Sequence, residues 1–141
     1  MQAKYISYQQ TNAFSSVVLD YIDGKDKLES FYKYSPTIQG FENAIAERKV
    51  TADRALLVSS LHRQYAHIQP SALVQSNINL LADDRTFTIT TGHQLNIFTG
   101  PLYFIYKIVT AINLARDLKL KFPDYNFVPV YWMATEDHDF E

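Results

Sequence analysis

The spacing of the apolar residues changes near residue 85. Before that point apolar residues recur at helical intervals, which predicts a mainly helical N-terminal segment over residues 1–85. The one candidate strand in this part is the run KYISY at residues 4–8. The predicted helical segments are AFSSVVLDYIDG with Gly24 as its C-terminal stop, DKLESFYKYSP, TIQGFENAIAERK, TADRALLVSSLHRQYAHI with Thr51 as its N-cap, and PSALVQSNINLLADD with Pro70 and Ser71 at its start.

The second part, residues 86–141, alternates between strand and helix patterns. Thr86–Thr90 is rich in β-branched residues and Phe127–Ala134 is a nearly continuous apolar run, so both are predicted strands. Between them, Leu102 to about Lys119 carries apolar residues at helical spacing. A strand, a helix and a strand in this order form a βαβ unit, with parallel strands and a right-handed crossover. The predicted fold class is therefore α/β.

Two features complicate this βαβ unit. Pro129 lies inside the second strand and cannot donate a ladder hydrogen bond, which favours an edge position or a bulge. In addition, two parallel strands alone do not make a stable sheet. We therefore expect further strands after Glu141, and we expect these 141 residues to be an incomplete part of a larger fold.

Composition narrows the class of protein. The chain is 47% hydrophobic and 20% charged, which is typical of a globular protein. A net charge of -2 and scattered basic residues give no reason to expect nucleic acid or a membrane as partner. The sequence shows neither a signal peptide nor a bilayer-spanning stretch. Because cysteine is absent, we expect no thiolate nucleophile and no disulfide, and the expected compartment is the cytoplasm.

Polar segments follow both predicted strands. TGHQLNIFTGP comes after the first strand and TEDHDFE comes after the second. The carboxyl ends of neighbouring parallel strands lie at one edge of a sheet, and α/β proteins bind their ligands there. This convergence predicts the position of the functional site.

The glycines of the first segment support two interpretations. Gly92 permits a tight turn and a close approach of a ligand to the backbone. Gly100 and Pro101 are typical of a helix start, with Thr99 or Gly100 as the cap and Pro101 at the first helical position. The free N–H groups of such a helix suit a phosphate or a carboxylate, but a capped helix with a long entry loop explains the same residues. The segment matches neither the dinucleotide fingerprint nor a Walker P-loop.

The polar and aromatic side chains around this segment also have alternative roles. His93 is a general acid or base, a contact to developing charge, or a histidine satisfied by backbone groups. Gln94 offers a donor and an acceptor at the strand end. Lys107 either reaches an anion or extends along its helix. Tyr103 and Trp132 either line a pocket or belong to the core.

The second segment gathers four ionisable residues, Glu136, Asp137, His138 and Asp139. If the strand continues, Glu136 and His138 face one way, and the two aspartates face the other. Three interpretations stay open: a divalent-metal site that includes His138, an aspartate and His93, an acid/base site that also binds an ammonium group, and a solvated acidic loop. We assign no metal on this basis.

Several stretches resemble one known family. TTGHQLNIFTGPLYFIYKIVTAINLA, VPVYWMATEDHDFE, AFSSVVLDYI, FYKYSP and TADRALLVSSLHRQY are similar to the N-terminal portion of the bacillithiol biosynthesis cysteine-adding enzymes, the cysteine ligases of that pathway. The resemblance covers nearly the whole chain. It implies that residues 86–141 begin a Rossmann-like catalytic core related to class I aminoacyl-tRNA synthetases. It also implies a coiled-coil arm and a homodimer in the full-length protein.

The resemblance further implies a reaction. L-cysteine is added to glucosaminyl-malate as an amide to the sugar amine, in the last step of bacillithiol biosynthesis. By analogy with the synthetases, TGHQ stands where their HIGH-type signature meets a nucleotide, so ATP is the expected cosubstrate. The isolated 141 residues are expected to be inactive. The implied active-site residues are His93, Asp137, His138 and Asp139, and the implied substrate or nucleotide contacts are Thr91, Gly92, Gln94, Thr99, Gly100, Tyr103 and Glu136.

Two other classes of function stay open at this point. The chain is also compatible with a non-catalytic module that binds an anion or nucleotide, or that assembles with another chain supplying the remaining strands. A metal-dependent hydrolase would require a bound divalent ion.

Overall fold

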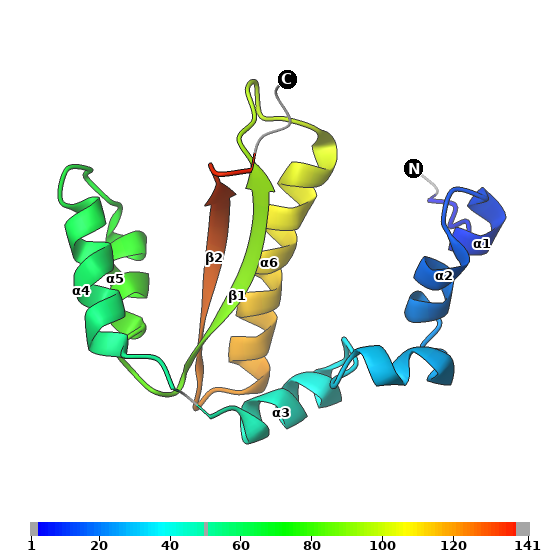
Figure 1. Cartoon of the computed structure of the whole chain (residues 1–141), viewed down its shortest axis with the longest axis horizontal. Coiled ribbons are helices and arrows are strands. Elements are labelled where there is room, and N and C mark those ends of the chain that lie inside the picture. The colour runs from blue at the N-terminus through cyan, green and yellow to red at the C-terminus, as the bar shows by residue number, and fades with distance from the viewer. Residues whose placement is uncertain (1–2, 50, 138–141) are drawn as a thin grey trace. The chain divides into compact units, whose positions relative to one another are not determined.

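The computed structural model describes residues 3–49 and 51–137 (Figure 1). The chain divides into two compact units, Met1–Lys49 and Val50–Glu141. The sequence-based boundary falls after residue 85, where helical patterns give way to strand patterns. The second compact unit contains the βαβ unit together with the two helices that lie between residues 50 and 85.

The first unit is helical. Its elements are α1 (Tyr8–Thr11), α2 (Ser16–Ile22), the 3₁₀ helix η1 (Asp26–Phe31) and α3 (Ile38–Glu47). Gly24 ends the second of these with a left-handed φ of 63°, as expected. The predicted strand at residues 4–8 is wrong, because Ser7 is the N-cap of α1 and its hydroxyl accepts a hydrogen bond from the Gln10 N–H at 3.3 Å.

Little of the first unit is buried. Gly40 is the one buried residue among those described in this unit. The apolar residues of the α2 segment recur at helical spacing, yet their side chains are exposed: Phe14, Val17, Val18, Tyr21 and Ile22. An amphipathic helix gains its stability from covering such a face, so this unit has an apolar surface that its own described residues do not cover.

The second unit contains α4 (Arg54–Tyr65), α5 (Ala72–Leu80), β1 (Thr86–Gln94), α6 (Leu102–Lys121) and β2 (Asn126–Ala134). Ser71 caps α5 as predicted, since its hydroxyl accepts from the Val74 N–H at 3.3 Å. The predicted cap of α4 at Thr51 is wrong. Asp53 holds that position, and its carboxylate accepts from the Leu56 N–H at 2.9 Å.

The two strands pair in parallel over their whole length, from Thr86 beside Asn126 to Gln94 beside Ala134. β1 is therefore longer than predicted, because Thr91–Gln94 continues the ladder instead of starting a loop. The α/β prediction with a βαβ unit is confirmed, and the arrangement of the two strands beside α6 is visible in Figure 1.

Pro129 does not interrupt the pairing of the strands. The Asn126 N–H donates to the Arg85 carbonyl at 2.9 Å, so even-numbered N–H groups of β2 point toward β1. The position of the missing Pro129 N–H therefore lies on the edge of β2 that faces away from β1. This is the edge position that the sequence favours for proline.

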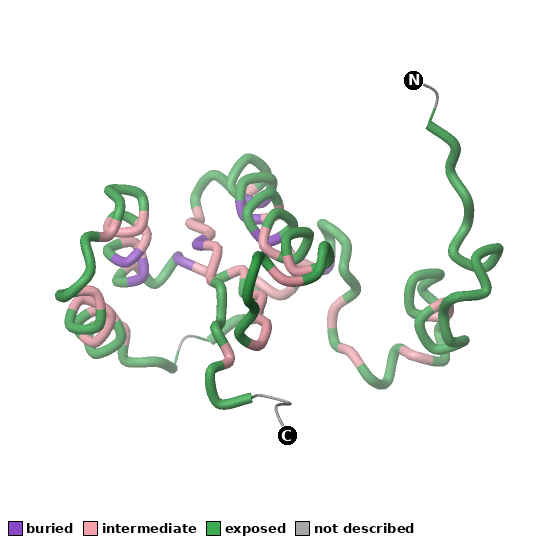
Figure 2. Tube along the Cα trace, turned by 90° about the horizontal axis from the view of Figure 1, so that it is seen from above, coloured by how far each residue is buried: buried purple, intermediate pink, exposed green. Residues whose placement is uncertain are grey.

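The core of the unit lies on both faces of the sheet, as the buried positions of α5, α6 and the strands in Figure 2 show. On one face, α6 packs through Ala111, Ala115 and Leu118, whose small or compact side chains permit a close approach to the strands. On the other face, α5 contacts β2, and Ile78 and Val128 are buried. Although α6 has 20 residues, neither it nor another described helix is long and apolar enough to cross a membrane.

Arg54 connects the helices of this unit to the sheet. Its guanidinium donates to the Leu81 carbonyl at 2.8 Å and to the Thr86 carbonyl at 2.9 Å, and its Nε lies 3.5 Å from an oxygen of Asp84. Only 15% of the Arg54 side chain is exposed. One side chain thereby joins the start of α4, the end of α5 and the first residue of β1.

We expect Arg54→Ala to lower the free energy of unfolding by about 3 kcal/mol, because it leaves two part-buried carbonyls without their charged donor. Urea unfolding of the chain measures this change. Arg63→Ala is the matched control, since exposed Arg63 lies on the same helix and its guanidinium donates within its own turn, to Ser60 at 3.1 Å. Equal stability of the two variants would contradict the role given to Arg54.

Candidate functional site

The predicted site residues of the first segment lie at the carboxyl end of β1. Thr91, Gly92, His93 and Gln94 are the last four residues of this strand, and they pair with Tyr131 to Ala134 of β2. The polar segments that follow the two strands therefore leave the sheet at the same edge. This is the edge at which parallel α/β sheets bind ligands.

Alternation along the strand sends neighbouring side chains to opposite faces of the sheet. The His93 ring faces α6, where its centroid lies 5.3 Å from that of Tyr103 and 5.8 Å from that of Phe104. Gly92 and Gln94 accordingly belong to the other face, together with Trp132 of β2. The side chains of the consecutive residues His93 and Gln94 therefore lie on opposite faces of the sheet.

Both ring nitrogens of His93 have partners in the same chain. Nε2 lies 2.8 Å from the hydroxyl of Tyr103 on α6. Nδ1 lies 3.0 Å from the Gln94 carbonyl oxygen and 2.9 Å from Nδ2 of Asn96. Asn96 also donates to the Gln94 carbonyl at 2.9 Å. The imidazole thus joins the strand end, the following loop and the first turn of the helix.

Gly92 is required by close packing against β2. A Cβ atom at this position would lie 2.8 Å from the carbonyl oxygen of Trp132 and 3.0 Å from its Cβ. The indole of Trp132 is 59% exposed on this face, and its Nε1 donates to Glu136 at 3.4 Å. The absence of a side chain at Gly92 therefore makes room for Trp132, which is a structural reason for the glycine beside any role in binding.

The loop between β1 and α6 has an unusual backbone. Phe98, Thr99 and Gly100 are consecutive residues with positive φ, at 51°, 68° and 63°. For a β-branched residue such as Thr99 this conformation is a strained one. Gly100 also lacks the Cβ that would lie 2.7 Å from Cγ of Asn96. The predicted helix start is shifted by one residue: Pro101 holds the N-cap position, no side chain caps it, and α6 begins at Leu102.

Sequence reasoning missed two residues of this region and left a third undecided. Asn96 is the partner of His93 and of the Gln94 carbonyl, and its signal is a lone amide in an apolar loop. Tyr131 donates to the His93 carbonyl at 3.2 Å. The two-residue period of the paired strands places its side chain on the same face of the sheet as the His93 ring. Lys107 donates to the carbonyl of Gly92, so in this structure it holds the strand end.

The second polar segment is described up to residue 137. β2 ends at Ala134, and Thr135 and Glu136 form a turn, so the strand does not continue into this segment and the alternating arrangement considered for its residues does not apply to Glu136. The Asp137 N–H donates to the Ala134 carbonyl at 3.4 Å, and both Glu136 and Asp137 are exposed. His138 and Asp139 lie outside the described residues, and the predictions made for them stay predictions.

Within residues 3–49 and 51–137, no three histidine or acidic side chains come together in a way that would hold a metal ion. The metal-site interpretation depends on His138, which lies outside the described residues, and it therefore stays untested.

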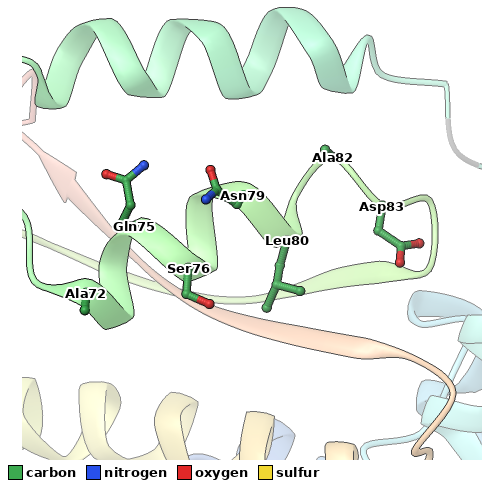
Figure 3. A pocket seen from close by; sticks show the side chains of 7 residues that line it. All are labelled: Ala72, Gln75, Ser76, Asn79, Leu80, Ala82 and Asp83. Atoms are coloured by element: carbon green, nitrogen blue, oxygen red, sulfur yellow. The ribbon is translucent and has the colours of Figure 1, made fainter.

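A separate hollow lies along α5 (Figure 3). It is lined by Ala72, Gln75, Ser76, Asn79, Leu80, Ala82 and Asp83. Asp83 accepts the Thr86 N–H at 2.9 Å through its carbonyl, which places this end of the hollow at the beginning of β1. Among residues 3–49 and 51–137, none of the predicted site residues lines it.

The elements and the strand-end residues together define an α/β protein with a βαβ unit whose polar segments converge at one sheet edge. A family model described as the N-terminal Rossmann-like domain of BshC, of bacillithiol biosynthesis, matches residues 1–141. The chain therefore belongs to the BshC family, and the predicted Rossmann-like fold and family resemblance are confirmed.

Individual relatives agree with this assignment. Two proteins named "Putative cysteine ligase BshC", from Flavobacterium psychrophilum and Flavobacterium johnsoniae, are 53% and 54% identical to this chain over its full length. A protein of the same name from Bacillus cereus is 33% identical, also over the full length. The chain spans about 27% of the length of the two Flavobacterium relatives.

We expect Gly92→Ala to lower the free energy of unfolding by about 2 kcal/mol, because the added methyl group forces the β2 backbone away from β1. Urea unfolding checks this expectation. Thr90→Ala is the control, since exposed Thr90 lies on the same strand and face, and the expected loss is below about 1 kcal/mol. If the Gly92 and Thr90 variants have equal free energies of unfolding, the β2 backbone can move away from residue 92 with little loss of stability, which would contradict this prediction.

Proposed function

We propose that this chain is the N-terminal part of a ligase that adds L-cysteine to glucosaminyl-malate in the last step of bacillithiol biosynthesis. The observation that carries the proposal is the convergence of two polar segments at the carboxyl edge of a parallel sheet, in a member of the BshC family. The names of the relatives support the ligase class.

The chemistry explains why a nucleotide is part of the proposal. Forming an amide from a carboxylate and an amine requires an oxygen of the carboxylate to leave, and a free carboxylate oxygen is a poor leaving group. Transfer of a phosphoryl or nucleotidyl group from ATP to the cysteine carboxylate supplies a better one. The sugar amine then attacks the activated carbonyl carbon, and the phosphate or nucleotide departs with the oxygen.

The residues of the first segment have roles as binding groups in this proposal. Gln94 and Gly92 lie on the sheet face away from α6, and Thr91 lies on the α6 face of the same strand end. Thr99 and Gly100 lead into an α6 terminus without a side-chain cap, whose N–H groups suit an anionic group of the substrate or nucleotide. Tyr103 lies in the first turn of this helix.

The acidic segment has the complementary role. Glu136 and Asp137 are exposed directly after β2, where carboxylates attract the ammonium group of cysteine or the amine of the sugar. Together with His138 and Asp139 they are the proposed groups for amine recognition and for removal of the amine proton. The proposed full-length protein is a cytoplasmic homodimer with a coiled-coil arm, by the family resemblance.

The alternative is a non-catalytic binding or assembly module. The exposed apolar residues of α2 and the two-stranded sheet of the described residues are the observations that favour it, because both would be covered by another chain. A partner that co-purifies with the chain and completes the sheet would support this alternative.

The ligase proposal is tested in a chimera, in which this chain replaces the matching 27% of the Flavobacterium johnsoniae relative. The chimera, its Asp137→Asn variant and its His138→Ala variant are each incubated with glucosaminyl-malate, L-cysteine and ATP, and bacillithiol is measured by mass spectrometry. We expect product from the unchanged chimera and a loss of about 100-fold or more in each variant. Asp124→Asn, in the exposed turn before β2, is the control and retains full activity.

Two outcomes would contradict the proposal in different ways. Equal product from all variants would remove the acidic segment from the chemistry. No product from a folded chimera, while the intact relative is active, would favour the binding module. Omission of ATP tests the nucleotide separately, since product without it would exclude ATP as cosubstrate.

A further inference from the structure

We infer that His93 is a positioning residue, which fixes the loop and the first turn of α6 against the end of β1 and exchanges no proton with the ligand. The activity test of this inference rests on the proposed ligase function, whereas a measurement by hydrogen–deuterium exchange does not depend on it. The inference decides between the roles that the sequence leaves open for this residue.

Both nitrogens of the His93 imidazole are occupied within the chain. Tyr103 lies at hydrogen-bond distance from Nε2, and the Gln94 carbonyl and Asn96 amide lie at that distance from Nδ1. In the tautomer with a proton on Nε2, the ring donates to Tyr103 and accepts from Asn96. In the tautomer with a proton on Nδ1, it donates to the Gln94 carbonyl and accepts from Tyr103. Either neutral form therefore has a partner in this chain at both nitrogens.

The His93 ring is directed into the packing between the strand end and α6. His93 faces α6 and is half-buried, in a group of rings that continues from Phe104 to Tyr131, whose centroids are 5.5 Å apart. A general acid or base must come within hydrogen-bond reach of the reacting group, whereas both nitrogens of this half-buried imidazole lie at hydrogen-bond distance from groups of the chain itself.

The His93 ring also holds the loop between β1 and α6 in place. The loop contains Phe98 and Thr99 at positive φ, and a strained backbone of this kind persists only where its surroundings fix it. Asn96, which packs against the bare Cα of Gly100, is fixed by His93 on one side and by the Gln94 carbonyl on the other. Removal of the imidazole would release the loop and Tyr103 together.

The experiment uses variants of the same chimera to test the contacts of the two ring nitrogens one at a time. His93→Asn retains an amide near the Nδ1 position and hence the contact with Asn96, whereas His93→Gln retains one near Nε2 and hence the contact with Tyr103. His93→Ala retains neither. Tyr103→Phe and Asn96→Ala remove the partners one at a time, and His67→Ala, an exposed histidine after α4, is the control.

Steady-state kinetics from about pH 5.5 to 8.5 distinguish positioning from proton transfer. We expect the Gln or Asn variant to stay within about 5-fold of the parent kcat, and His93→Ala to raise the KM for ATP or cysteine on the order of 10-fold, the equivalent of two lost hydrogen bonds. The shape of the pH profile stays that of the parent. The titratable groups around the ring are Tyr103 and Tyr131, with Lys107 on the next turn of α6.

A loss of about 100-fold or more in kcat in all three His93 variants, together with loss of a limb of the pH profile, would overturn the inference in favour of proton transfer. Hydrogen–deuterium exchange over residues 95–106 is the readout that does not depend on activity. Exchange in this segment rises in His93→Ala and stays near the parent level in at least one amide variant. Unchanged exchange in His93→Ala would also overturn the inference, even if the chimera makes no bacillithiol.

Discussion

The arrangement of the candidate site depends on the parallel ladder between β1 and β2, which continues to Gln94 and Ala134. Because pairing persists through Gly92 and His93, the side chains there obey the two-residue period of a strand. That period sends the imidazole toward α6 and the Gln94 amide to the opposite face. A ladder ending at Thr90, as the sequence predicts, would leave both side chains in a loop with no fixed relation between them.

Gly92 allows the ladder to continue at this place. The backbone of Trp132 approaches so closely that a side chain on residue 92 would displace it, and the same proximity leaves the indole on the open face. The carbonyl of Gly92 is in turn held by Lys107, and that of His93 by Tyr131. One residue of β2 and one of α6 thus hold the last carbonyls of the strand, which is the pre-organisation that a binding edge requires.

The sequence predicted the elements that have strong local signals. The apolar period of Leu102–Lys119, the β-branched run at Thr86 and the cap at Ser71 each determine their own structure through nearby residues. The features it could not predict depend on distant contacts. The extension of β1 needs β2 as a partner. The contact between Asn96 and His93 needs a loop in which three consecutive residues have positive φ, and of these three residues only Gly100 is of a type that predicts such a backbone. Asp53 replaced Thr51 as the α4 cap because both are good cap residues and only the helix start distinguishes them.

The apolar residues of α6 lie on more than one side of the helix. Its buried residues face the sheet, yet Leu102, Ile105, Tyr106, Val109 and Ile112 are exposed. A helix that is apolar on more than one side is typical of a position inside a larger protein. The chain spans about 27% of the two Flavobacterium relatives, so they contain ample sequence to cover such a surface. Covering the apolar side of α6 that faces away from the sheet would bury these five side chains and stabilise the helix on which Tyr103 and Lys107 are placed.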